Sequence, residues 1–177
     1  MNRKYFLLLP VFLCFLLVGC GGYAGNPLVE NTSEFWRVEI ATAEVVTGLA
    51  GSQSQLQYGG TVIEIPLEQM PSAGHLFLIL DMAVEKINAG RSTFSWRDTF
   101  ITDDNGNKWQ RHANDTFLDS FGFSRLRGSD IVMGLNEGHV CYEIPVQAAR
   151  GNLWFVHESD DGFIKIEINI LNKRDIR

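Results

Sequence analysis

Residues 163–171 read FIKIEINIL, and apolar and polar residues alternate strictly from position 164 to position 170. Four isoleucines share one side of this alternation: Ile164, Ile166, Ile168 and Ile170. A period of two places successive side chains on opposite faces of a β-strand, whereas the faces of a helix repeat every 3.6 residues. The segment therefore predicts a strand with one face in a hydrophobic core and the other in water.

Similar runs precede it, separated by turn residues. They predict strands at 35–46, 61–66, 75–84, 93–103, 108–113, 138–145 and 152–159. In the first of them, one face would carry Trp36, Val38, Ile40 and Thr42. The run at 75–84 is apolar on both faces, which is typical of a strand buried between two layers. Asn105-Gly106 predicts a hairpin turn, because both residues tolerate positive φ.

The segments between these runs are expected to be loops. Residues 51–60 read GSQSQLQYGG, a polar stretch flanked by glycines, and we expect a surface loop there. Pro66 is expected to end the strand before it. Residues 146–151 would join two strands as a small loop, and in a regular hairpin Ile144 would then face Leu153 and Val140 would face His157.

No amphipathic helix of four turns is predicted anywhere in the chain. About seven short strands with turns between them predict an all-β fold, an antiparallel immunoglobulin-like β-sandwich occupying residues 34–177. There is no internal repeat and no second domain boundary.

The first nineteen residues have the composition of a signal peptide. Arg3 and Lys4 precede an apolar run at 5–18 that is too short to span a bilayer comfortably. Leu17-Val18-Gly19-Cys20 resembles the lipobox of bacterial lipoproteins. The resemblance implies cleavage between Gly19 and Cys20, lipidation of Cys20, and a flexible tether at 20–33. The alternative is an ordinary signal peptide with an incidental cysteine.

Lipidation would place the protein at the cell membrane, facing the extracytoplasmic side. Two or three acyl chains anchor a protein firmly, whereas one chain does so only marginally. Loss of residues 1–19 would leave 13 basic against 21 acidic residues. We expect no binding of nucleic acid, which requires clustered Lys and Arg.

The remaining cysteine, Cys141, has no partner for a disulfide after cleavage and lipidation. It lies within a predicted strand, so a buried structural thiol is favoured over a catalytic nucleophile.

Three further segments carry a family resemblance. They are GHLFLILDMAVEKINAG (74–90), FITDDNGNKW (100–109) and GLNEGHVCYEIP (134–145), the last followed by NLWFV. Together they resemble a family of bacterial lipoprotein domains of unknown function, similar to a secreted mycobacterial immunoprotective antigen. The resemblance covers about residues 35–171 and implies an immunoglobulin-like fold. It supplies no catalytic residue, and it is interrupted by an insert at 114–130.

Two groups of residues resemble metal sites but have simpler structural explanations. Asp103, Asn105 and Asn107 have the alternate spacing of calcium ligands, but the glycine and glutamate of an EF-hand loop are missing. A hairpin turn explains them better.

The four histidines are expected as isolated surface residues rather than zinc ligands: His75, His112, His139 and His157. We therefore predict no metal, no cofactor and no catalytic residue.

The insert at 114–130 is the most unusual stretch, because it gathers aromatic and basic residues in an irregular segment. One interpretation is an Ω-type loop with a helical turn after Asn114 that packs its aromatics onto the sandwich. The other is a partner-binding surface, since aromatic residues and arginine dominate interface hot spots. Its candidate residues are Phe117, Phe121, Phe123, Arg125 and Arg127.

Three functions remain open on the sequence. The favoured one is a non-catalytic interaction module of the cell envelope, with an envelope protein or glycan as its partner. The alternative is a small-ligand or carbohydrate module that stacks sugars on Trp96, Trp109 or Trp154. The least favoured is an envelope enzyme whose site has no recognisable motif.

Overall fold

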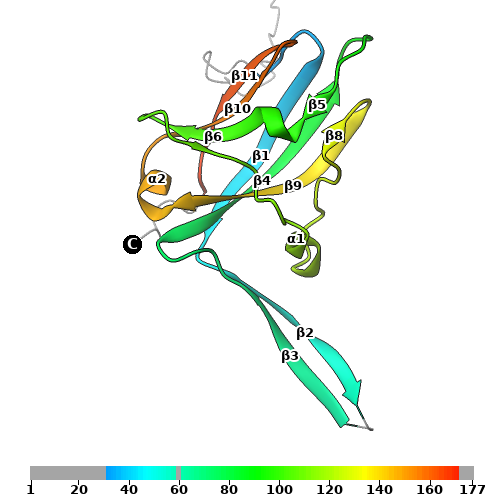
Figure 1. Cartoon of the computed structure of the whole chain (residues 1–177), viewed down its shortest axis with the longest axis vertical. Coiled ribbons are helices and arrows are strands. Elements are labelled where there is room, and N and C mark those ends of the chain that lie inside the picture. Colours follow the sequence, from blue (N-terminus) through cyan, green and yellow to red (C-terminus); the bar gives the residue numbers. More distant parts are fainter. Residues whose placement is uncertain (1–30, 59–60, 172–177) are drawn as a thin grey trace, which may run out of the picture.

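The computed structural model describes residues 31–58 and 61–171. The predicted signal peptide, Gly19, Cys20 and most of the predicted tether lie outside these residues. Two antiparallel layers form the body of the molecule (Figure 1). The first has the order β1-β4-β9 and consists of β1 (Trp36–Val46), β4 (His75–Lys86) and β9 (Leu135–Pro145).

The second layer has the order β11-β10-β6-β7. Its strands are β11 (Gly162–Glu167), β10 (Leu153–Ser159), β6 (Thr99–Asp103) and β7 (Lys108–Trp109). One buried hydrophobic cluster draws side chains from both layers, among them Leu78, Tyr142 and Phe155. The predicted all-β antiparallel sandwich is therefore confirmed, and in the described part of the chain its two layers contain seven strands.

Short elements connect the layers. β5 (Phe94–Ser95) pairs with β8 (Asp130–Ile131), and the 3-10 helix η1 (Trp96–Asp98) follows β5. The described part of the chain contains two short α-helices, α1 (Phe117–Ser120) and α2 (Val146–Arg150). No helix among the described residues is long and apolar enough to cross a membrane.

The expected hairpin between β9 and β10 is wrong. Ile144 faces Leu76 of β4 and Val140 faces Leu80, while β10 pairs with β6 and β11 in the other layer. The reason is α2, which replaces the expected loop and carries the chain across the sandwich with Ala149 buried.

The predicted alternation is confirmed, because Ile164, Ile166 and Ile168 are buried and the residues between them are exposed. The strand itself is shorter than predicted, since β11 ends at Glu167. In β1 the prediction is only half right. Trp36 and Val38 are buried, but a bulge between Ile40 and Thr42 shifts the register by one residue. Beyond the bulge Ala43 and Val45 face the core instead of Thr42, as expected when one residue is added to a strand.

The expected loop is wrong as well for residues 51–58, whereas residues 59–60 lie outside the described part of the chain. β2 (Leu49–Tyr58) and β3 (Thr61–Gln69) form a long two-stranded arm (Figure 1). Pro66 does not end β3, because the register moves from Gly51↔Leu67 to Ser54↔Ile65 and leaves Pro66 at a bulge. A proline is tolerated there, since the bulge requires no ladder hydrogen bond from it.

Candidate functional site

The insert at 114–130 folds against the outer face of the β1-β4-β9 layer. Leu118, in α1, is buried together with Phe77 and Ile79 of β4 and Cys141 of β9. Phe117 and Phe123 pack against this second, smaller hydrophobic cluster. The predicted helical turn after Asn114 is thus confirmed as α1, and so is the packing of Phe117 and Phe123 onto the sandwich.

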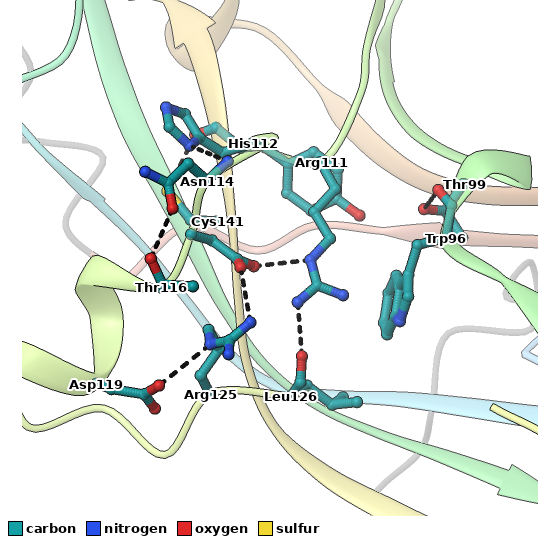
Figure 2. A network of polar contacts seen from close by, with 12 residues as sticks. Trp96, Thr99, Arg111, His112, Asn114, Thr116, Asp119, Arg125, Leu126 and Cys141 are labelled. Carbon is teal, nitrogen blue, oxygen red and sulfur yellow. Dashed lines mark hydrogen bonds and ion pairs between the residues drawn. The ribbon is translucent and has the colours of Figure 1, made fainter. Parts of the chain in front are cut away.

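A buried carboxylate ties the insert to the preceding segment (Figure 2). Asp115 accepts a hydrogen bond of 2.7 Å from Nε of Arg111, and Nη1 of Arg125 lies 3.3 Å from its other oxygen. The side chains of Asp115, Arg111 and Arg125 are only 6%, 10% and 18% exposed. Nε of Arg125 also reaches Asp119, at 3.3 Å. Two guanidinium groups therefore share one buried carboxylate.

Arg111 extends this network into the body of the protein. Its Nη2 donates to the carbonyl oxygen of Leu126 at 2.6 Å, and its guanidinium lies over the ring of Trp96, 4.5 Å from the centroid (Figure 2). The segment before the insert is fixed to β9 as well, because His112 N–H donates to the Cys141 carbonyl at 2.8 Å. Both ends of the insert are thus held.

The last part of the insert runs along the free edge of β9. The His139 N–H donates to the Ser124 carbonyl at 2.7 Å, and the Leu126 N–H donates to the His139 carbonyl at 2.9 Å. This close approach is possible because the neighbouring residue is Gly138, with φ +149°. A β-carbon there would lie 2.5 Å from the Ser124 carbonyl oxygen.

Two hollows of opposite character flank the insert. One, of about 700 Å³, is lined by Arg97, Arg111, His112 and Arg125 together with Trp96 and Asp115. The other, of about 630 Å³, lies over the β1-β4-β9 face and is lined by Glu39, Asp81, Glu137 and His139 with Ser124 at its rim. The insert thus separates an arginine-lined hollow from a carboxylate-lined one.

The predicted partner-surface residues do not all reach solvent. Phe117, Phe121 and Phe123 are half-buried, Arg125 is engaged in the network, and Arg127 is exposed. Sequence reasoning missed three exposed apolar side chains that follow the insert: Val132, Met133 and Leu135, which are 54%, 72% and 58% exposed. The sequence offered a signal for this exposed apolar surface, because three of the four residues at 132–135 are apolar although the segment is turn-like. Arg111 and Asp115 were also missed.

The tryptophans are poor sugar platforms. Trp96 is 5% exposed and lies under Arg111, so it cannot stack on a ligand from solvent. Trp109 packs partly buried against the main core, and the ammonium of Lys165 lies 4.6 Å from the ring centroid of Trp154.

Asp103 and Cys141 have structural roles, as expected. The Asp103 carboxylate accepts hydrogen bonds from the backbone N–H groups of Asn105 and Asn107, at 3.0 and 2.9 Å, and thereby closes the β6–β7 hairpin. The side-chain amide of Asn107 contributes most to lowering the pKa of that carboxyl. Burial raises the pKa of the Cys141 thiol, which disfavours the nucleophilic thiolate.

The histidines do not converge. Nε2 of His112 lies 3.7 Å from Glu143, and Nε2 of His139 lies 4.0 Å from Asp81. Within 31–58 and 61–171, no group of three His, Cys, Asp or Glu side chains is placed to hold a metal ion. The expectation that all four are surface residues is wrong for His157, which points into the core and is fully buried.

His157 stacks on Phe94, with ring centroids 4.2 Å apart. Neither of its ring nitrogens has a hydrogen-bond partner among the described residues. Burial lowers the pKa of the imidazole, and the carboxylates of Asp98 and Asp161 oppose this with smaller effects.

This burial should make the protein less stable in acid. The unfolded chain takes up a proton on His157 near pH 6.5, whereas the fold keeps the ring neutral to lower pH. The contribution of His157 is complete above that pH and is lost as pH falls below it, by at most about 1.4 kcal/mol per pH unit. Urea unfolding in steps from neutral pH downward should show this slope. His157→Phe, which keeps the ring stack, should reduce it, and an equal slope in the variant would contradict the assignment.

Comparisons with known proteins give distant similarities only. No protein-family model matches the chain, and no curated protein matches it. A conserved hypothetical protein from Bacillus anthracis is 15% identical, with a TM-score of 0.49, over 78% of this chain and 93% of that one. The "putative lipoprotein (ycdA)" of Bacillus subtilis is 14% identical, with a TM-score of 0.48, over 80% of this chain and 38% of that one.

An uncharacterized β-sandwich protein from Clostridium difficile is 11% identical, with a TM-score of 0.43, over 78% of this chain and 88% of that one. At these identities and TM-scores the similarities carry no conclusion about function. The resemblance to the mycobacterial antigen type stays a prediction.

Proposed function

We propose that this protein is a lipid-anchored, extracytoplasmic β-sandwich that acts as a non-catalytic interaction module of the cell envelope. The anchor would be Cys20, exposed by cleavage after Gly19. The observation that supports the interaction role best is the packed insert, which presents a fixed surface between two oppositely charged hollows. A rigid and charge-patterned surface favours recognition of a specific partner.

The partner surface we propose is the exposed continuation of the insert. It consists of Arg127, Val132, Met133 and Leu135, and we call it the 127–135 surface. Three exposed apolar residues and an exposed arginine within nine positions of the sequence have the composition of an interface centre. The half-buried Phe117 and Phe123 pack against the cluster around Leu118 and Cys141 instead, so the proposed surface does not include them. Phe121 stacks edge-on against Phe117 and is left out as well.

The anchor is tested by metabolic labelling. Growth with a labelled fatty acid should label the wild-type protein, and Cys20→Ala should abolish both the label and the partition of the protein with membranes. Membrane association of Cys20→Ala at the wild-type level would refute the anchor.

The partner surface is tested by crosslinking in the intact envelope, followed by mass spectrometry. Met133→Ser should remove at least one crosslinked protein, because it deletes the most exposed apolar side chain of the surface. Met70→Ser is the matched control, since Met70 is 64% exposed and lies just after β3, at the base of the β2–β3 arm. Identical crosslinked sets for the wild type and Met133→Ser would refute the 127–135 surface without touching the anchor.

A further inference from the structure

The β2–β3 arm has no neighbouring strand. Within the described residues β2 and β3 pair only with each other, and Figure 1 shows the arm extending away from both layers of the sandwich. Each of its strands therefore has one edge whose backbone groups are free to pair with a further strand. A two-stranded ribbon in water is only marginally stable by itself, and additional strands stabilise it.

The two edges of the arm differ in their sequence. β3 reads TVIEIPLEQ and carries Glu64, Pro66 and Glu68. β2 reads LAGSQSQLQY, with no charged residue and no proline in ten positions. Charges and prolines are the usual devices that keep an edge strand from pairing with another chain. β3 has these devices and β2 lacks them, so β2 is the edge that accepts a further strand.

We propose that the further strand is β2 of a second copy of this chain. Antiparallel pairing of β2 with itself creates a two-fold symmetric, four-stranded sheet in the order β3-β2-β2-β3. The charge of the protein favours this arrangement. The chain carries 21 acidic against 15 basic residues, yet β2 self-pairing brings no charged residue opposite another. Pairing through β3 would bring Glu64 and Glu68 of the two copies close together, which is unfavourable.

The register locates the two-fold axis. Beyond the bulge, regular pairing in the arm runs from Ser54↔Ile65 to Tyr58↔Thr61, and Leu56 is the middle residue of this part of β2. With the axis at Leu56, the whole stretch 54–58 pairs with its copy, and Gln55 faces Gln57 of the other subunit. Leu56 is also opposite Ile63 within the arm, so four apolar positions form one row across the sheet.

The test is disulfide crosslinking in intact envelope membranes. Leu56→Cys places two thiols at directly opposed positions, which in an antiparallel pair are about 4.5 to 5.5 Å apart between Cα atoms and within disulfide reach. Mild oxidation should convert most of this variant to a dimer on a non-reducing gel. Ile63→Cys is the matched control, because in the proposed sheet its two copies are three strand spacings apart, about 14 Å, and should stay monomeric. Equal crosslinking of both variants, or none at Leu56→Cys, would overturn the proposal.

Charge variants test the register in the same assay. In the Leu56→Cys background, Gln55→Lys with Gln57→Lys sets lysine opposite lysine twice and should lower dimer formation about tenfold. Gln55→Lys with Gln57→Glu sets opposite charges together in the same places and should restore it. Failure of that restoration would refute the two-fold at Leu56. A crosslinked product whose mass identifies a different protein would replace the second copy with another partner and also overturn the proposal.

Discussion

Replacing Asp115 by Ala should lower the free energy of unfolding by about 3 to 5 kcal/mol, the cost of leaving buried charge without its partner. The reason is that two guanidinium groups share this carboxylate, and Arg111 is only 10% exposed on its side chain. Without Asp115, Arg111 keeps its hydrogen bond to the Leu126 carbonyl and its stack on Trp96, but its nearest counter-charge is gone. The loss is measured by urea unfolding followed by tryptophan fluorescence.

A second readout separates local detachment of the insert from general destabilisation. Cys141 is buried beneath the insert, in contact with the cluster around Leu118. In Asp115→Ala, a thiol reagent should modify Cys141 far faster than in the wild type, as located by peptide mass spectrometry. Asp119→Asn is the control, because Asp119 is 38% exposed and surface ion pairs are worth about 0 to 1 kcal/mol. Wild-type stability and labelling in Asp115→Ala would refute a structural role for the shared carboxylate.

The sandwich could be predicted because its strands are half-buried or fully buried, and burial leaves a pattern. Ile164, Ile166 and Ile168 alternate with polar residues because one face of β11 and of the residue that follows it lies on the core. Residues 76–80 are apolar on both faces because one side of β4 faces the main core and the other the cluster beneath the insert. In both segments the position in the layers dictates the residue type.

The β2–β3 arm was missed because this argument does not apply to it. β2 lies outside the two layers, so its sequence need not alternate with a core, and its glutamines and serines are typical of a loop. A local signal for a hairpin was present, since Gly59-Gly60 separates two runs of suitable length for strands.

The crossing of the chain from one layer to the other at α2 was missed for another reason. A six-residue connection fits a hairpin and a crossover between layers equally well, and only the packing of Ala149 decides between them.

The composition of the sequence identified the segment that forms the candidate site, but it did not predict the buried ion pairs within it. The density of aromatic residues at 114–130 marked the right segment, yet it could not say that Phe117 and Phe123 face inward. Arg111 and Asp115 are four residues apart, a spacing that signals a pair on a helix, and no helix is present there. The network around them also includes Arg125, which bonds Asp115, and the Leu126 carbonyl, which bonds Arg111. These partners are ten or more positions away in the sequence, so no local pattern predicts the contacts.

The close approach of the insert to β9 has its own test at Gly138. A β-carbon at this position would lie 2.5 Å from the Ser124 carbonyl oxygen and 2.9 Å from the Leu126 nitrogen, and both atoms belong to backbone that cannot rotate away. With φ at +149°, the backbone conformation also disfavours any residue other than glycine. Gly138→Ala should therefore cost about 3 kcal/mol in the free energy of unfolding, from strain and overpacking together.

Gly122→Ala is the matched control, because Gly122 lies in the same insert at φ +85° with open space around its β-carbon position. It should cost about 1 kcal/mol, the conformational penalty alone. The difference between the two variants therefore combines the contact between the insert and β9 with the greater backbone strain at φ +149°. In Gly138→Ala the bonds that join Ser124 and Leu126 to His139 cannot keep their lengths, so Cys141 labelling should accelerate there and stay at the wild-type rate in Gly122→Ala. Equal unfolding free energies and equal labelling in both variants would show that the insert is held by its side chains alone, with no contribution from the backbone contact at Gly138.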